Sequence, residues 1–166
     1  MIRPACASDL PALVDIYNHY VRETPITFDI EEASVDGRRV WFEQFAPEGR
    51  HQLIVSEQKG QLAGYAHSTA FRPKPAYRRS VETTVYLEPS FMGQGTGSAL
   101  LAELLARLDA AQAHRAYAII TLPNEASIRV HEKLGYRHLM TLSEVGHKFG
   151  RYWDTRWMER KFDETD

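Results

Sequence analysis

Three glycines at alternate positions mark the part of this 166-residue sequence with the clearest potential for chemistry. Gly93, Gly95 and Gly97 lie in VYLEPSFMGQGTGSALLAELLARL, between an apolar strand pattern and a leucine-rich helix pattern. Glycine adopts positive φ and lets another group approach the main chain closely. Amide N–H groups at a helix N-terminus carry partial positive charge, so this junction favours an anion such as a pyrophosphate. A strand-to-helix turn with spare glycines is the alternative.

The glycine spacing differs from that of two common phosphate-binding loops. A Walker loop ends in Gly-Lys-Ser/Thr, whereas Gly97 is followed by Ser98 and Ala99. A dinucleotide fingerprint reads G-x-G-x-x-G, whereas this stretch reads G-x-G-x-G. The residues therefore predict an anion site without naming the nucleotide.

Two side chains could transfer protons, and one could be a nucleophile. Glu82 lies among Val and Thr residues on the strand pattern before the glycines, where an apolar setting would raise its pKa toward that of a useful base. A solvated edge-strand glutamate is the alternative. His131 lies three residues from both Ile128 and Leu134, near the inward stripe of a helix, where a core histidine is the commoner outcome. Cys6 has no histidine near it in the sequence, so we interpret it as structural.

A basic stretch, FRPKPAYRRS, leads into the strand that carries Glu82. Its cations are Arg72, Lys74, Arg78 and Arg79. The planar donor fork of arginine suits carboxylate or phosphinate oxygens. The stretch therefore indicates a site for an acidic acceptor, with a solvated basic loop as the alternative.

The first half of the chain predicts alternating strands and helices. We expect a short strand in MIRPA and a helix that Ser8 caps and that runs to about Arg22. Ser34 would cap a second helix, which carries Val40, Trp41 and Phe45. HQLIVSEQ and QLAGYAHSTAF flank Lys59-Gly60, a pattern typical of a hairpin.

The second half continues the same alternation. The alternating residues 81–87 predict a strand whose two sets of side chains face opposite sides. After the glycines, a helix face is predicted by two neighbouring rows of leucines: Leu100, Leu104 and Leu108, and Leu101 and Leu105. RAYAIITL reads as a buried strand, and Asn124 caps a short helix that ends at Gly135. Two last strands, near 136–146 and 152–162, bracket KFGRY. The whole predicts a mixed sheet with helices on both faces.

Composition narrows the class of protein. The net charge is −2, the pI is near 6.4 and no Lys/Arg run exceeds two residues, so we expect neither a nucleic-acid nor a membrane partner. One cysteine and an N-terminus without a signal-peptide layout suit a cytoplasmic protein. The length favours a single domain, 1–166.

The sequence resembles the GNAT N-acetyltransferases. VYLEPSFMGQGTGSALL is similar to their acetyl-CoA-binding motif, Arg/Gln-x-x-Gly-x-Gly/Ala, although Met92 stands at the Arg/Gln position. Four further stretches resemble the phosphinothricin and methionine sulfoximine N-acetyltransferase branch: IRPACASDLPALVDIYNHYV, FRPKPAYRRSVETTVYLEP, NEASIRVHEKLGY and VGHKFGRYWD. The resemblance implies an α/β fold with a mixed, mostly antiparallel sheet of about seven strands, and a homodimer with active sites near the interface. Met92 implies weaker binding of acetyl-CoA rather than its loss.

The resemblance also implies roles for individual residues. Acetyl-CoA would be held by main-chain groups of Val85, Tyr86 and Leu87, by Gly93, Gln94, Gly95, Thr96, Gly97 and Ser98, and by Asn124, which could equally be only a helix cap. Glu82 matches the branch's general base, and His131 stands where many family members carry a tyrosine that protonates the departing sulfur. The acceptor would be lined by Phe28, Arg72, Pro73, Lys74, Glu82, Thr83 and Thr84, with Lys148 in a segment that relatives lend across the dimer interface.

These residues predict an acetyl-CoA-dependent N-acetyltransferase that works by direct attack in a ternary complex, without a metal. The favoured acceptor is the α-amine of a small amino-acid analogue. A polyamine, an ordinary amino acid or a protein N-terminus is the close alternative. A non-catalytic acyl-CoA-binding module is a third possibility, to which Met92 lends weight and against which Glu82 argues.

Overall fold

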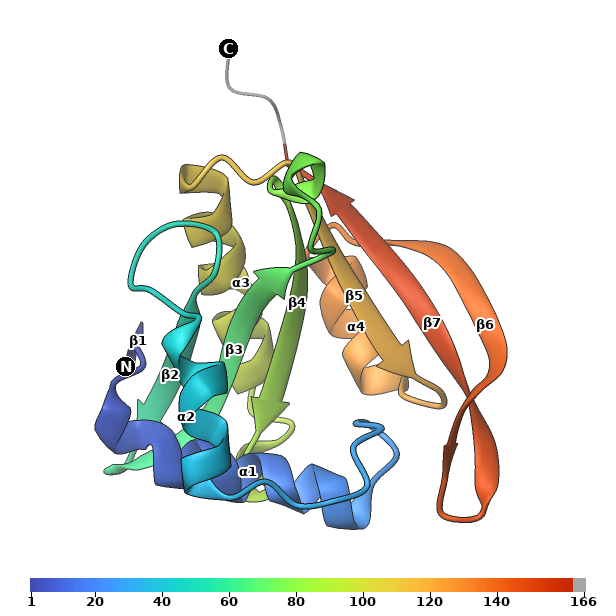
Figure 1. The fold of residues 1–166 in the computed structure, drawn as a ribbon, viewed down its shortest axis with the longest axis horizontal. Coiled ribbons are helices and arrows are strands. Elements are labelled where there is room, and N and C mark those ends of the chain that lie inside the picture. The colour runs from blue at the N-terminus through green and yellow to red at the C-terminus, as the bar shows by residue number, and fades with distance from the viewer. Residues whose placement is uncertain (163–166) are drawn as a thin grey trace.

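One seven-stranded sheet organises residues 1–162, the part of the chain that the computed structural model describes (Figure 1). Its strands are β1 (Ile2–Pro4), β2 (Leu53–Gln58), β3 (Gln61–Ala70), β4 (Ser80–Leu87), β5 (Arg115–Thr121), β6 (Arg137–Lys148) and β7 (Arg151–Lys161). They lie in the order β1-β2-β3-β4-β5-β7-β6, and only the β4–β5 pair is parallel. The predicted mixed, mostly antiparallel sheet is therefore confirmed.

Two helices cover each face of the sheet. The helices α1 (Leu10–Glu23) and α2 (Val35–Glu43) lie in front in Figure 1, and α3 (Thr96–Ala110) and α4 (Glu125–Lys133) lie behind. Ser34 caps α2 as predicted, because its Oγ accepts the Gly37 N–H at 3.0 Å. None of the helices in residues 1–162 is long and apolar enough to cross a membrane.

The predicted cap of the first helix is wrong. Ser8 lies in a 3₁₀ turn, Ala7–Asp9, and α1 begins at Leu10 with Asp9 at its N-cap position. The Asp9 carboxylate accepts hydrogen bonds from the Arg3 guanidinium at 2.7 and 2.9 Å and from the Cys6 N–H at 2.8 Å. Contacts with the first strand thus fix the turn before α1, and the local run of polar residues could not reveal them.

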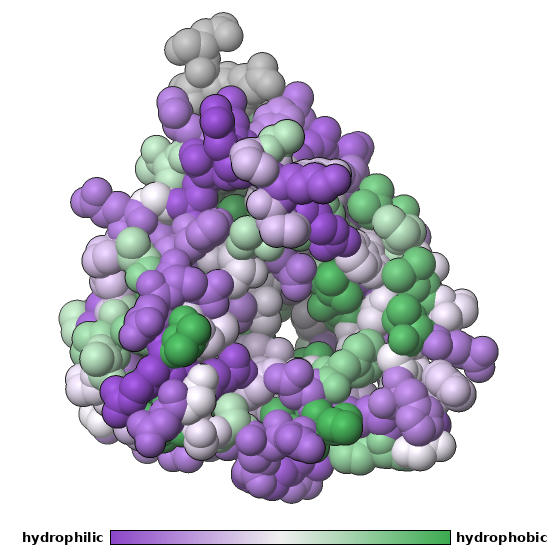
Figure 2. Space-filling view, in the orientation of Figure 1, coloured by the Kyte–Doolittle hydropathy of each residue, from purple (hydrophilic) through white to green (hydrophobic). Residues whose placement is uncertain are grey.

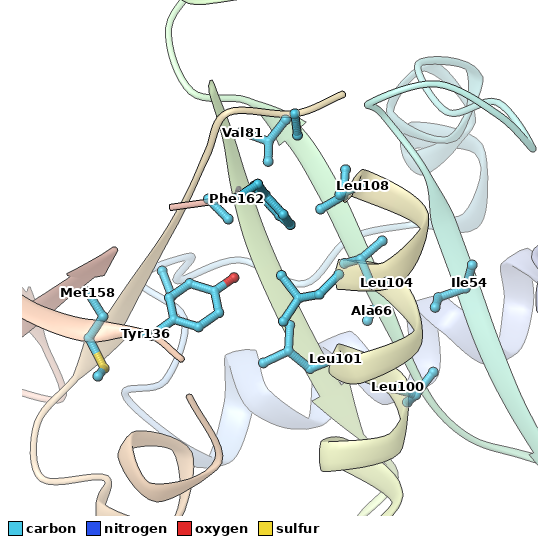
Figure 3. Close-up of a cluster of buried hydrophobic side chains, with 14 of the residues drawn as sticks. Ile54, Ala66, Val81, Leu100, Leu101, Leu104, Leu108, Tyr136, Met158 and Phe162 are labelled. Atoms are coloured by element: carbon cyan, nitrogen blue, oxygen red, sulfur yellow. The ribbon is translucent and has the colours of Figure 1, made fainter. Parts of the chain in front are cut away.

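The leucines of α3 pack against the back of the sheet. Leu100, Leu104 and Leu108 are fully buried, and Figure 3 shows them beside Ile54 and Ala66 of the central strands. A second cluster on the front face joins α1 to the sheet through tyrosine rings. The two clusters hold β4 between them, so the strand that carries Glu82 is fixed from both faces.

Candidate functional site

The main opening in the sheet is the gap between β4 and β5. The two strands pair only at Ser80–Glu82 with Arg115–Tyr117. Beyond Glu82 they diverge, so the β4 edge from Thr83 onward has no strand partner on this side. Figure 2 shows a hollow in the face that carries α1 and α2, at the position of this gap.

A cavity of about 50 Å³ lies in the gap. Its lining comes from both diverging strands, from the start of α4 and from the loop after α1: Ile26, Thr83, Thr84, Val85, Tyr86, Ala118, Ile119, Ile120, Thr121, Asn124, Ser127 and His131. The β5 residues in this set were missed from the sequence, because RAYAIITL reads only as a buried strand. The available signal was the strand's place after a crossover from β4, which makes it the parallel neighbour.

The glycine stretch forms an open cradle at the start of α3. Gly93 and Gly95 have φ of 74° and 82°, and a Cβ built on either would meet no atom within 4 Å. The first intrahelical donor is Ala99, whose N–H bonds to the Gly95 carbonyl at 3.0 Å. The N–H groups of the first α3 residues, Thr96 to Ser98, therefore have no helical acceptor and can bind an anion.

The third glycine has a different purpose. A Cβ on Gly97 would lie 3.3 Å from Leu87 Cδ1, so this glycine lets the end of β4 pack closely against α3. Tyr20 fixes the same point from the other face: its hydroxyl donates to the Leu87 carbonyl at 2.7 Å and accepts the Leu87 N–H at 3.2 Å. The main-chain groups of Leu87 are therefore engaged by Tyr20, whose part the sequence did not indicate.

Glu82 occupies the last β4–β5 pair before the gap. It is half-buried, on the front face with Thr84 and Tyr86, and it lies opposite Tyr117. Burial raises the pKa of its carboxyl group, and the positive charge of Arg72 opposes part of that rise. A carboxylate with a raised pKa at the mouth of a gap can act as a general base near neutral pH.

His131 lies in α4 with one nitrogen engaged. It is 3% exposed, and its Nδ1 lies 2.8 Å from the Ser127 carbonyl oxygen. A carbonyl only accepts, so Nδ1 carries the proton and Nε2 is the free acceptor. Burial lowers the pKa of the imidazole, so His131 is neutral at pH 7.

Thr83 and Asn124 both have structural partners at the gap. The Thr83 hydroxyl donates to the Tyr117 carbonyl at 3.2 Å and contacts the Tyr136 hydroxyl at 2.6 Å, on the face opposite Glu82. Asn124 Oδ1 accepts the Ser127 N–H at 3.2 Å, which confirms its predicted role as a helix cap. Thr83 therefore bridges the two strands where they begin to separate.

Arg72 of the basic loop takes part in two sets of contacts. Arg72 reaches toward Glu82, with its guanidinium carbon 4.4 Å from the Phe71 ring centroid and 6.0 Å from that of Trp157. Pro73 and Lys74, together with Arg72, line a cavity of about 440 Å³ at the end of the sheet. Its other walls come from the loop before β2, from Pro75 and Arg78, and from the ends of β3 and β4 at Ala70 and Ser80. Glu82 is not among its lining residues.

The loop after α1 meets the β6–β7 hairpin beside the gap. A Cβ on Gly146 would clash with the Phe28 ring, so Phe28 packs directly on that glycine. Lys148 is 4% exposed, and its Nζ donates to the Thr27 carbonyl at 2.8 Å. Phe28 and Lys148 thus hold two segments of the same chain together near Ile26, which lines the gap.

The arrangement fits a thioester cosubstrate with a phosphorylated carrier. The α3 cradle offers unpaired N–H groups without side-chain obstruction, and the gap offers an open strand edge that leads from the cradle to Glu82. Met92 is 45% exposed beside this cradle, so a longer side chain there would have room. Cys6 follows the first strand and contacts Ser8 and Asp9, which supports a structural role for this cysteine.

Comparison with known proteins agrees with this geometry. Residues 13–136 match the model of the acetyltransferase (GNAT) family. A phosphinothricin N-acetyltransferase of Streptomyces coelicolor is 51% identical over 96% of this chain and 94% of that protein. An L-methionine sulfoximine/L-methionine sulfone acetyltransferase of Pseudomonas paraeruginosa is 35% identical over 99% of this chain and 95% of its own.

A solved structure extends the agreement to three dimensions. The phosphinothricin acetyltransferase of Sinorhizobium meliloti, crystallised with acetyl-CoA, superposes with a TM-score of 0.94 at 33% identity, covering 99% of this chain and 89% of that one. This chain belongs to the GNAT acetyltransferase family and is an N-acetyltransferase with acetyl-CoA as its cosubstrate.

Proposed function

We propose that the enzyme acetylates the α-amine of a small amino-acid analogue of the methionine sulfoximine or phosphinothricin type. The observation that carries this proposal is the position of Glu82, a half-buried carboxyl group at the mouth of the β4–β5 gap with Arg72 beside it. A base with a cation beside it suits a substrate that carries an amine and a carboxylate. The names of the two curated relatives point to the same class of acceptor.

Glu82 would begin the reaction as general base. It accepts a proton from the acceptor ammonium, and the neutral amine attacks the thioester carbonyl, so that a C–N bond forms and the carbonyl electrons move to oxygen. The C–S bond then breaks, and one N–H proton passes to the departing thiolate. The products are the N-acetyl compound and free thiol, with one proton left on Glu82. Direct attack needs no acetylated enzyme residue.

His131 is our candidate for the proton transfer to sulfur. Because Nδ1–H donates to Ser127, only Nε2 can take part. That nitrogen must first accept the proton that the attacking amine loses, and it can then give it to the thiolate. Because the pKa of His131 is lowered, the imidazolium formed in this way releases the proton readily.

The cosubstrate would lie along the open β4 edge. We propose that the main chain of Val85 and Tyr86 pairs with its pantetheine arm, and that Gly93 to Ser98 hold the pyrophosphate. Leu87 would contribute chiefly by position, since Tyr20 already engages its main chain. Asn124 could offer its side-chain amide to the same arm while its Oδ1 caps α4.

The wider organisation is also a proposal. We infer one catalytic domain over 1–166, because a single sheet runs from Ile2 to Lys161. A homodimer is supported by exposed apolar side chains on β6 and the hairpin tip, among them Met140, Val145 and Phe149. In such a dimer the KFGRY segment would lie near an active site. We place the enzyme in the cytoplasm, where acetyl-CoA is available and a single thiol stays reduced.

The acceptor class is tested by thiol release from acetyl-CoA across a panel of amino-acid analogues, polyamines and peptides. Methionine sulfoximine and phosphinothricin are expected to give the highest kcat/KM. If a polyamine or a peptide N-terminus exceeds them, the enzyme serves another amine, which is the second candidate function.

The role of Glu82 is tested by Glu82→Gln, which keeps the shape of the side chain. We expect kcat to fall by roughly 10²–10⁴ while the Kd for acetyl-CoA stays the same, because only the proton acceptor is lost. Initial rates with both substrates varied should give intersecting lines in the wild type. Parallel lines would indicate an acetyl-enzyme and contradict direct attack.

A further inference from the structure

Arg38 is a cation without an acidic partner on the face that carries Glu82. Its guanidinium carbon lies 3.9 Å from the centroid of the Tyr17 ring and 4.7 Å from that of Trp41. Among residues 1–162 no carboxylate oxygen lies within 4.0 Å of its nitrogens, whereas the neighbouring Arg39 pairs with Asp36 at 3.0 Å. A half-buried guanidinium fixed between two rings is ready to donate hydrogen bonds to an oxygen-bearing group.

His67 is a second polar group beside Trp41. It lies on β3, and its ring packs against Trp41 at 5.5 Å and Phe45 at 5.6 Å between centroids. Its Nδ1 is buried with no partner within the described chain. A bare acceptor is less costly to bury unpaired than an N–H, so the proton belongs on Nε2, at the accessible side of this half-buried ring.

Arg38 and His67 belong to one cluster. Both contact the Trp41 ring. Burial, with the positive charge of Arg38 as a lesser cause, lowers the pKa of His67 to about 3. The imidazole is therefore a neutral donor at any working pH. Asp29 borders the same Tyr17 ring, but its carboxylate accepts the hydrogen bond of the Tyr17 hydroxyl.

The strand register places this cluster at a useful distance from Glu82. Glu82 lies opposite Thr69, and His67 lies opposite Thr84, so Glu82 and His67 are diagonal neighbours on one face, about 7–8 Å apart. Arg72 lies toward the other end of the strand, where the Phe71 N–H bonds to the Ser80 carbonyl. Along the sheet, Glu82 therefore lies between Arg72 on one side and the pair of Arg38 and His67 on the other.

We propose that Arg38 and His67 form a second polar subsite, which receives the oxygen-bearing end of the acceptor's side chain while Arg72 holds its carboxylate. This inference rests on the proposed function and sharpens it. The subsite suits a tetrahedral sulfur or phosphorus centre with oxygen atoms: a sulfone, a sulfoximine or a phosphinate. An amino acid of the same length without oxygen at that end leaves both donors unpaired, and the enzyme discriminates against it.

The first test compares three acceptors of similar length: phosphinothricin, methionine sulfone and methionine. Arg38→Met keeps an aliphatic stem against Tyr17 and Trp41 and removes the donors. We expect kcat/KM to fall roughly 10–100-fold for phosphinothricin, less for the neutral sulfone, and within about twofold for methionine. Arg39→Met, one position along α2, is the matched control and should change none of the three.

The second test separates the histidine from the arginine. His67→Phe keeps the packing against Trp41 and Phe45 but has no nitrogen. Its kcat/KM should fall roughly 3–10-fold for the sulfone and for phosphinothricin alike, because a neutral donor does not distinguish their charge. Thermal melts with and without acetyl-CoA show whether each variant is folded and still binds the cosubstrate.

The outcomes separate this inference from the proposed function. If wild type acetylates methionine as efficiently as its sulfone, the amino-acid activity stands and the subsite is wrong. An equal loss for all three acceptors in Arg38→Met would also overturn it, because the arginine would then only hold α2 in place. If wild type acetylates no amino acid but does acetylate another amine, both the proposed acceptor and the subsite fail.

Discussion

Single residues set the protonation state on which this site depends. Glu82 has a raised pKa because it is buried, while Arg72 pulls the same pKa down. The folded protein therefore binds the Glu82 proton more tightly than the unfolded chain does. Ionisation of Glu82 costs stability as pH rises through the raised pKa. An ionised Glu82 therefore lowers the free energy of unfolding. Glu82→Gln cannot ionise, so this variant should be at least as stable as the wild type at pH 7.

The same two residues predict a pH dependence. In the wild type, kcat/KM should rise with pH through the raised pKa of Glu82 and then level off. Arg72→Met removes the opposing charge, so the acid limb should move to higher pH, and KM for a carboxylate acceptor should rise roughly 10-fold or more. The measurement is a pH profile of kcat/KM for both forms. A limb that stays in place in Arg72→Met would show that Arg72 is not coupled to Glu82.

At the scale of elements, local sequence patterns predicted individual helices, strands and caps but not the contacts between them. The cap at Ser34, the cap at Asn124 and the strand that carries Glu82 all follow from short-range spacing. The start of α1 depends on Arg3, and the position of Leu87 depends on Tyr20, 67 residues away. Neither contact is accompanied by a repeating pattern of residues, so it cannot be predicted from a single sequence.

The cradle before α3 gives a prediction with a built-in control. Gly95 and Gly60 both have positive φ, 82° and 78°, with open space where a Cβ would lie. Alanine at either position should cost roughly 1–2 kcal/mol of stability. Only Gly95→Ala should raise KM for acetyl-CoA, because Gly60 lies in the β2–β3 hairpin. Urea unfolding and initial rates measure the two effects, and an equal rise in KM for both variants would refute the assignment.

Thr83 gives a second prediction at this scale. Thr83→Val leaves the Tyr117 carbonyl and the Tyr136 hydroxyl without their shared partner, so it should destabilise the protein by about 1–3 kcal/mol. Tyr136→Phe keeps the Thr83–Tyr117 bond and should cost less. Urea unfolding of both variants gives the comparison. Equal losses would mean that Thr83 does not bridge the strands.

At the scale of the whole molecule, the family resemblance predicted the fold and its cosubstrate, whereas composition excluded only broad classes. The number of strands and the order of the elements were both within reach of the sequence. The contacts of the basic loop were not, because Arg72 reaches the rings of Phe71 and Trp157 and also lines, with Lys74, the cavity at the end of the sheet. Side-chain direction in a proline-rich loop follows from tertiary contacts rather than from local pattern.

Ligand linkage gives a prediction for the complete protein. Acetyl-CoA binds the native state, so an excess at 100 times Kd should add about 2.7 kcal/mol of stability and raise Tm. Met92→Arg should enlarge that shift, because an arginine there can reach the phosphates from an exposed position. Differential scanning fluorimetry measures both. An unchanged shift in Met92→Arg would show that the position does not face the phosphates.

The split between β4 and β5 leaves two unpaired strand edges in the middle of the sheet, joined by only three residue pairs. Unpaired edges are templates for non-native pairing, and most proteins keep them short or covered. Here the cosubstrate can cover them. The supply of acetyl-CoA would then govern how long the protein survives without aggregating, as well as how fast it works.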